Sequence, residues 1–243
     1  MRLTDLYEDT GHENLALNEA VFGTALGAIA NIRDGGDDAL EVMEGITDQM
    51  RSYGCRPSER LLTVLINCYG NFRRPDAAES VLREMEAIYM GSGEDKFRPR
   101  TEAYNAAILA FAKVGNAERC QALLDEMLDK YSRGEDTVKP NSNTFEYVIN
   151  ALWKSKGANV PAKVQYVLQL MEDKYAAGEE DLAPTAAAYT SVINAMARSD
   201  LPDKAVRAKE LLQKANRQVE SGNARAKPDA SLYTAVLNAC AFT

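Results

Sequence analysis

Basic side chains recur at equivalent places in the second half of the chain, where they could bind successive phosphate groups. Lys113, Lys154 and Arg198 each follow a similar apolar segment, and such cations neutralise nucleic-acid phosphates. A second column is able to donate and accept hydrogen bonds and consists of Asn67, Asn150, Asn194 and Asn238. A structural interpretation stands beside each: the cations end solvated helices, and the asparagines cap or bridge neighbouring backbone.

Residues for catalysis or metal binding are scarce. The single histidine, His12, lies in a polar N-terminal stretch, and the four cysteines are far apart without a CxxC pair. We expect these cysteines to be reduced core or boundary residues of a reducing compartment, neither zinc ligands nor disulfides. No cluster of aspartates suggests a metallonuclease. The sequence therefore predicts a chain that is not an enzyme, with no metal, no cofactor and no small-molecule substrate.

The columns belong to an internal repeat. YNAAILAFAKVGN (104–116) aligns without gaps to LTVLINCYGNFRR (62–74), FEYVINALWKSKG (145–157), YTSVINAMARSDL (189–201) and YTAVLNACAFT (233–243), and FGTALGAIANIRD (22–34) aligns more weakly. Because a fixed period of this size indicates a repeat architecture, we divide the chain accordingly. A lead-in, 1–18, precedes repeats 1 to 5, and these cover 19–58, 59–100, 101–141, 142–185 and 186–229. Residues 230–243 form the first helix of a truncated sixth.

Each repeat contains two helical patterns, and we number positions from its first residue. Apolar residues recur at positions 4, 8 and 11 of the first pattern, a spacing that places them on one face of an α-helix. Position 10 is always small, which allows a neighbouring helix to approach closely. A proline ends every full repeat, at Pro57, Pro99, Pro140, Pro184 and Pro228. Helix pairs of this kind bury their apolar faces by stacking, so the sequence predicts an all-α solenoid.

The repeat resembles the pentatricopeptide repeat. The sequence AYNAAILAFAKVGNAERCQALLDEML…VKPN (103–141) carries the resemblance best, and the recurrences extend it over residues 19–243. The tetratricopeptide alternative fits less well, since the only tryptophan, Trp153, does not recur. The resemblance implies an α-solenoid wound as a right-handed superhelix. These repeats run 40 to 44 residues, longer than the family's usual unit, and we place most of the extra length in loops after the second helix.

Base recognition is what the resemblance implies for position 5 and the last residue of each repeat. At about 100° per residue, positions 2, 5, 9 and 13 share a face opposite the apolar stripe. Repeat proteins of this kind read one base per repeat with two or three side chains. Here the pairs are Gly23 with Ser58, Thr63 with Arg100, Asn105 with Asn141, Glu146 with Thr185, and Thr190 with Asp229, while Thr234 begins a sixth.

Only two of these pairs resemble familiar recognition combinations. Thr190/Asp229 is similar to the type that prefers G, and Asn105/Asn141 is similar to the type that reads pyrimidines. The remaining pairs have no ready interpretation, and a carboxylate at Glu146 would repel a nearby phosphate. Position 2, typically aliphatic in the family, varies here among alanine, arginine, glutamate, asparagine and serine. The base-reading columns are therefore less regular than the apolar columns.

The net charge of −8 argues against a nucleic-acid partner when it is taken alone. Its distribution softens that objection. The first sixteen residues of the repeats together contain eight basic and six acidic residues, so the first helices carry +2 and the rest of the chain −10. Acidic residues concentrate in second helices and loops, where solvation is their ordinary role. We expect binding that is weak and sensitive to salt.

Three functions remain open. The first is an array that binds single-stranded RNA, within an organellar factor for RNA processing, stability or translation. The second is a solenoid that binds protein partners, and the third is the RNA-binding arm of a larger nuclease, as in protein-only RNase P. Family resemblance places the protein in mitochondria or plastids, although the acidic N-terminus is neither a signal nor a transit peptide. No membrane span is expected, and the incomplete last repeat indicates a fragment with Tyr233, Leu237 and Phe242 partly exposed.

Overall fold

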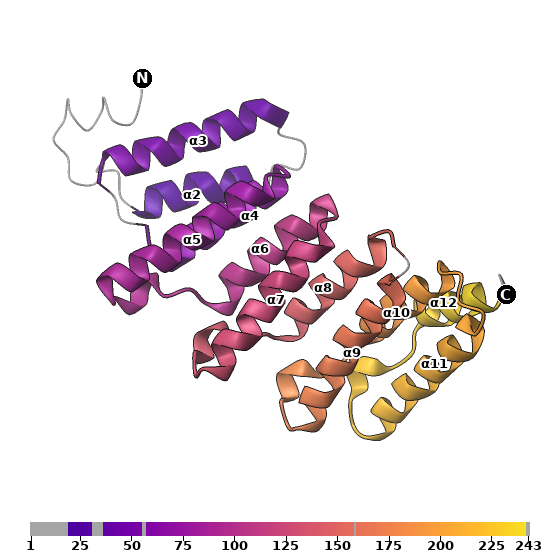
Figure 1. The fold of residues 1–243 in the computed structure, drawn as a ribbon. Coiled ribbons are helices and arrows are strands. Elements are labelled where there is room, and N and C mark those ends of the chain that lie inside the picture. Colours follow the sequence, from indigo (N-terminus) through magenta and orange to yellow (C-terminus); the bar gives the residue numbers. More distant parts are fainter. Residues whose placement is uncertain (1–18, 31–35, 55–56, 158, 242–243) are drawn as a thin grey trace. The chain divides into compact units, whose positions relative to one another are not determined.

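The computed structural model describes residues 19–30, 36–54, 57–157 and 159–241 of the chain. All regular structure in these ranges is helical (Figure 1). The first helices of the repeats are α2 (Glu19–Ala30), α4 (Glu59–Asn71), α6 (Thr101–Val114), α8 (Ser142–Lys154), α10 (Ala186–Ala197) and α12 (Ala230–Ala241). The second helices are α3 (Gly36–Ser52), α5 (Pro75–Ser92), α7 (Ala117–Ser132), α9 (Val160–Ala176) and α11 (Lys204–Glu220). Each first helix begins at the residue that opens a predicted repeat.

Local sequence explains where these helices begin and end. The N-cap side chains of Ser58, Asn141 and Thr185 accept a hydrogen bond from the backbone N–H three residues later, which satisfies a donor that the helix leaves free. Proline opens α5 in the first turn, where no intrahelical N–H is needed. Gly93 ends the same helix with φ of 68°, a conformation that glycine adopts without strain. The residues at the ends of these helices are therefore ones that favour helix initiation or termination.

The chain divides into two compact units, residues 1–110 and 111–243, with the boundary inside α6. In the first unit, α4 packs against both α2 and its own partner α5. Phe22 and Leu26 of α2 and Ile66 of α4 are buried between them. A Cβ at Gly70 would come within 3.1 Å of the Ala110 Cβ, so α4 approaches α6 at a position that only a very small residue fits.

The second unit repeats the same packing with α10 at its centre. Helix α10 contacts α8 and α12, which are first helices of the neighbouring repeats, and also contacts the second helices α9 and α11 (Figure 1). Tyr189, Ile193 and Met196, from positions 4, 8 and 11 of α10, are all buried. The apolar stripe of a first helix is thus covered on several sides by its neighbours, as expected for a stacked repeat array.

The lengthened loops after the second helices contain a structural element that the sequence interpretation left as loop. Each of four loops forms a short 3-10 turn, at Asp95–Phe97, Asp136–Val138, Glu180–Leu182 and Ala224–Ala226. The last residue of each turn is buried and lies two positions before the closing proline: Phe97, Val138, Leu182 and Ala226. The extra length therefore adds one core residue per repeat.

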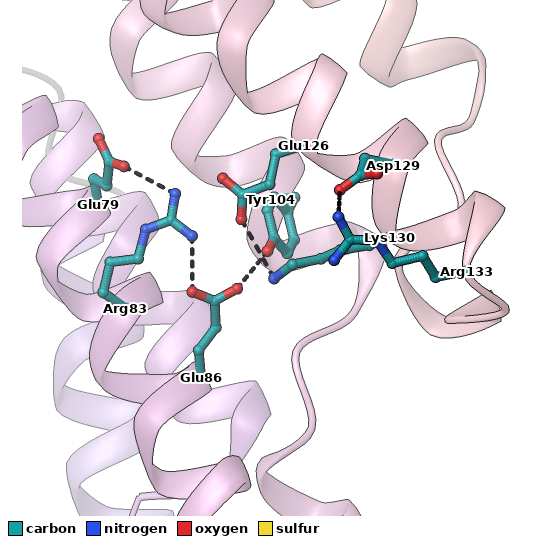
Figure 2. A network of polar contacts seen from close by, with 8 residues as sticks. All are labelled: Glu79, Arg83, Glu86, Tyr104, Glu126, Asp129, Lys130 and Arg133. Carbon is teal, nitrogen blue, oxygen red and sulfur yellow. Dashed lines mark hydrogen bonds and ion pairs between the residues drawn. The ribbon is translucent and has the colours of Figure 1, made fainter.

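Neighbouring repeats are also joined by a buried tyrosine hydroxyl. In the first unit, Tyr104 of α6 donates to Glu86 of α5 at 2.5 Å, and Glu86 accepts from Arg83 at 2.7 Å (Figure 2). In the second unit, Tyr189 of α10 donates to Glu172 of α9 at 2.6 Å. Burial, and next the hydrogen bond to Glu172, raises the pKa of Tyr189. The same contact thus connects repeat 3 to repeat 2 and repeat 5 to repeat 4.

The apolar columns are buried throughout repeats 2 to 5, except for half-buried Tyr69. The expectation of burial is wrong at Ala28, which is exposed, and at Cys240. Tyr233 and Leu237 of α12 are 49% and 68% exposed; among the described residues α12 contacts α10 and α11 but has no second helix of its own repeat against it. Phe242 and His12 lie outside the described residues.

Two of the cysteines behave as core residues. Cys68 and Cys120 are buried thiols with no disulfide among the described residues, and burial raises their pKa to about 11 and about 12, which makes the thiolate scarce at neutral pH. Cys240 is an exposed thiol, also with no disulfide among the described residues, and Cys55 lies outside them. Buried thiols of this kind pack as small apolar side chains.

Candidate nucleic-acid interface

The polar side chains at positions 5, 9 and 13 of the first helices become more exposed to solvent toward the C-terminal end of each helix. Position 5 is half-buried in repeats 1 to 5 and exposed only at Thr234. Position 9 is mixed, with Asn150 and Asn194 half-buried and Asn67 and Asn238 exposed. At position 13, Lys113, Lys154 and Arg198 are all exposed. These columns therefore form a solvent-accessible polar face, with its cations at the C-terminal ends of the helices.

Two cations of this face gather around one aromatic ring in the second unit. The Lys154 Nζ lies 5.9 Å from the centre of the Trp153 ring, and the Arg198 Cζ lies 5.8 Å from it. Arg198 also donates to the Trp153 carbonyl at 3.2 Å. Both cations are at helix C-termini, where they complement the helix dipole as well. Cation–π contacts hold the charges of repeats 4 and 5 beside each other.

Lys113, the third member of this column, lies near the end of α6. Desolvation by neighbouring protein atoms lowers its pKa from the ordinary value, although the residue stays exposed. The basic column is thus confined to the second unit, since position 13 of repeat 2 is Asn71.

The asparagine column is only partly structural. Asn150 accepts from the Trp153 indole N–H at 3.1 Å and from the Ser191 hydroxyl of α10 at 3.0 Å, so it connects two first helices. Asn67 instead donates to the carbonyl of Thr63 in its own helix. Asn150 thus bridges two side chains, whereas Asn67 makes one hydrogen bond to a backbone carbonyl of its own helix.

The residues that end repeats 1, 3, 4 and 5 cap the helix that follows: Ser58, Asn141, Thr185 and Asp229. Asn141 and Thr144 form a reciprocal capping box, and Asp229 accepts from the Leu232 N–H at 2.9 Å. Thr190, at position 5, donates to the carbonyl of Ala186 in its own helix. Asn141 and Asp229 therefore have a role in helix capping that needs no ligand.

One predicted base-reading pair is in direct contact. The Thr185 hydroxyl donates to Glu146 Oε1 at 2.7 Å, which brings position 5 and the last residue of repeat 4 side by side. Ser58 likewise caps α4, but its hydroxyl and N–H are bound by Glu19 at position 1 and not by Gly23. Position 5 and the last residue of repeat 4 are therefore neighbours in the structure.

In the first unit the polar face carries carboxylates. Thr63 donates to Glu59 at 3.1 Å, while Arg100 is paired with Asp95 at 3.4 Å. Burial raises the pKa of Glu59, opposed by the Thr63 hydrogen bond and by the positive charge of Arg100. The negative charge of Glu102 raises the pKa of Glu59 further. This half of the face is therefore less suited to a polyanion than the second unit.

Trp153 is the member of the interface that sequence reasoning missed. In the sequence, Trp153 served only to argue against the tetratricopeptide alternative, yet its place between an Asn at position 9 and a Lys at position 13 could have indicated a shared cluster. Within the described ranges, no group of three or more histidine, cysteine, aspartate or glutamate residues could hold a metal ion. None of the helices described is both long and apolar enough to cross a membrane.

Family comparisons identify the repeat. A family model described as the pentacotripeptide-repeat region of PRORP matches residues 2–131, more than half of the chain. The chain belongs to the pentatricopeptide-repeat family. A second family model, the PPR repeat, matches residues 187–216 in the fifth repeat.

Solved structures of a pentatricopeptide repeat protein are similar to this chain at low sequence identity. The pentatricopeptide repeat protein PPR10 from maize is 17% identical over 98% of this chain, with a TM-score of 0.43. PPR10 in complex with an 18-nt psaJ RNA element has the same identity and TM-score. This chain spans 43% and 34% of those two structures. No curated protein sequence matches the chain.

Proposed function

We propose that this pentatricopeptide-repeat chain binds single-stranded RNA along the polar face of its first helices. The observation that carries the proposal is the cluster in which Lys154 and Arg198 flank Trp153, on a face whose deeper positions are half-buried hydrogen-bonding groups. Cations meet the phosphates, and positions 5 and 9 face the bases. The complex of PPR10 with an RNA element supports the partner class.

The wider role follows the family. We assign the chain to a mitochondrial or plastid factor for RNA processing, stability or translation. The chain contributes binding and no chemical step of its own. Because the overall charge is −8, affinity depends on the local basic column, and it falls steeply as salt is raised.

Replacing Lys113, Lys154 and Arg198 together by Ala tests this function. Each lost phosphate contact reduces the slope of log K against log salt by about 0.7 on a single strand, so the triple variant should lose about 2 in slope and at least about tenfold in affinity at low salt. Binding to short single-stranded RNAs is measured by fluorescence anisotropy at several salt concentrations. Trp153, the only tryptophan, should change its emission when RNA binds.

A matched control replaces three exposed cations of second helices and their loops, Arg133, Lys209 and Arg217, by Ala. The control removes the same charge but leaves the polar face intact, so its affinity should stay close to that of the wild type. Equal losses in both triple variants would show a non-specific charge effect. Absence of any RNA binding at low salt would overturn the proposal and favour a protein-binding array.

Base preference provides an independent test of the face itself. Thr190 and Asp229 resemble the pair that prefers G, and Thr190→Asn should shift that preference toward U at one position of the RNA. An unchanged preference would show that position 5 of repeat 5 does not face a base.

A second function is favoured by the first family match. Because the matching region is described as belonging to PRORP, we infer that the array could serve as the RNA-binding arm of a larger nuclease. In such a protein, the triple Ala variant should raise KM for RNA and leave kcat nearly unchanged, since the cations bind substrate equally in the ground and transition states. A loss confined to kcat would contradict an arm that only binds.

A further inference from the structure

A basic pocket of about 660 Å³ lies at one end of the helix pairs in the second unit. Its walls are the turn between α6 and α7 and the turn between α8 and α9. Three lysines line it, Lys154 at the end of α8, Lys156 in the turn and Lys163 in the first turn of α9. Polar side chains of Asn116, Ser155 and Asn159 also line the pocket.

The charge of this pocket is not balanced from within. Glu118 is the only carboxylate residue of the lining, against three lysines. None of the three lysines has an ion-pair partner among the residues that the structure describes, and each is exposed. Other lysines of the chain are paired with carboxylates, including Lys96 with Glu94, Lys174 with Glu179 and Lys214 with Glu172. In a chain of net charge −8, the pocket is thus a local concentration of uncompensated positive charge.

The backbone around the pocket adds to the attraction for an anion. Helix α9 begins at its wall, and the N-cap residue Asn159 makes no side-chain hydrogen bond to the first turn. The positive end of the helix dipole is therefore not neutralised by a cap at this point. Two glycines of the lining, Gly115 and Gly157, have φ of 79° and 144° and carry no side chain that would narrow the entrance.

The pocket is continuous with the basic column because Lys154 belongs to both. We propose that it binds a phosphate group of the RNA backbone, with Lys156 and Lys163 as contacts beyond the column on the first helices. The inference rests on the proposed RNA binding and deepens it. A strand that follows positions 9 and 13 past Lys154 reaches the pocket at the turn of repeat 4, where a phosphate meets three cations at once.

The variant Lys156→Gln with Lys163→Gln tests this site and leaves all first-helix positions unchanged. We expect affinity for single-stranded RNA to fall about tenfold at low salt, and the slope of log K against log salt to shrink by about 0.7 to 1.4, with base preference unaltered. The matched control, Lys96→Gln with Lys209→Gln, removes the same charge from exposed places away from the pocket. Circular dichroism checks that both variants stay folded.

Inorganic phosphate gives a readout that does not depend on RNA. In the wild type it should shift the amide resonances of Gly115 and Gly157, and the pocket variant should lose these shifts. Equal RNA affinities and salt slopes for the pocket and control variants would overturn the inference while the proposed function stands. If the wild type binds no RNA, the proposed function fails, and phosphate shifts would then assign the pocket to a free anion and overturn the RNA-backbone site.

Discussion

The two units carry polar residues at the same positions of their first helices, but the side chains that bind or flank these residues differ in charge. In the first unit, Glu19 binds Ser58 and Glu59 binds Thr63, so carboxylates occupy the hydrogen-bonding positions. In the second unit, Lys154 and Arg198 flank Trp153, and Asn150 connects α8 to α10. The repeats therefore keep the same packing while different charged side chains bind or flank their polar positions. RNA affinity should be concentrated in the second unit.

The contact that joins neighbouring repeats also differs between the units. Glu86 of the first unit is balanced by Arg83 of its own helix, and its side chain is 17% exposed. Glu172 of the second unit is 5% exposed and accepts from Lys214 of α11. The second unit thus connects three helices through one carboxylate: α9, α10 and α11. The face with the cations is supported by the more buried of the two contacts.

Removing the carboxylate from each contact should give the largest difference between the units. Glu172→Ala leaves the buried Tyr189 hydroxyl without its acceptor and Lys214 without its carboxylate partner, so that Lys214 keeps only Gln169. We expect it to lower the free energy of unfolding by about 3 kcal/mol. Glu86→Ala, in the more exposed site, should cost about 1 kcal/mol. Urea denaturation followed by circular dichroism measures both, and Trp153 fluorescence reports on the second unit.

The neutral variant Glu172→Gln serves as the control for this comparison. It keeps an acceptor for the Tyr189 hydroxyl and removes only the charge that Lys214 faces, so its cost should fall between those of the two alanine variants. If Glu172→Ala and Glu86→Ala lower the free energy of unfolding by the same amount, the contact with Lys214 of α11 adds no stability, and the contrast between the two contacts is wrong.

The core of this fold could be predicted from the sequence because it depends on periodic burial. Tyr104, Ile108 and Phe111 recur at a helical spacing, and the structure buries all three. The closing prolines likewise predicted the step between repeats. The 3-10 turns were missed because a single apolar residue such as Phe97 or Val138 in an acidic loop has no period that distinguishes it from a solvated loop.

The site was less predictable because its members act through contacts between helices. The residue types at positions 5, 9 and 13 were visible, but the cluster around Trp153 depends on which side chains of α8 and α10 meet. The Tyr–Glu contacts had a signal that went unread. Tyrosine at position 4 occurs in repeats 3, 5 and 6. The second helices before repeats 3 and 5 contain Met85-Glu86 and Met171-Glu172, whereas Ala215-Asn216 stands at the equivalent place before Tyr233. Repeat 4 combines Phe145 with Leu128 instead.

Removing the charge of Glu146, a carboxylate of the second unit, should have a smaller effect than the substitutions above. Glu146 faces the polar side of α8 and accepts from Thr185, and its charge opposes the nearby Lys154 in attracting a phosphate. Glu146→Gln keeps an acceptor for Thr185, so RNA affinity should rise about threefold at low salt with little change in folding stability. Fluorescence anisotropy at low and high salt measures the gain, which should vanish at high salt. A gain that persists would point to base contacts instead of charge.

Glu59 in the carboxylate-rich unit should give the smallest effect, visible through pH. Its pKa is raised by burial, so between its ordinary value of 4.5 and the folded value the native state binds more protons than the unfolded state. Stability contributed by this group therefore falls as pH rises through that interval. Glu59→Gln should remove the decrease and slightly raise the urea midpoint at pH 7, by less than Glu86→Ala lowers it. The exposed Glu41→Gln on α3 is the matched control. If the urea midpoint depends on pH in the same way in both variants, burial of Glu59 has no effect on the free energy of unfolding, and this carboxylate does not destabilise the first unit.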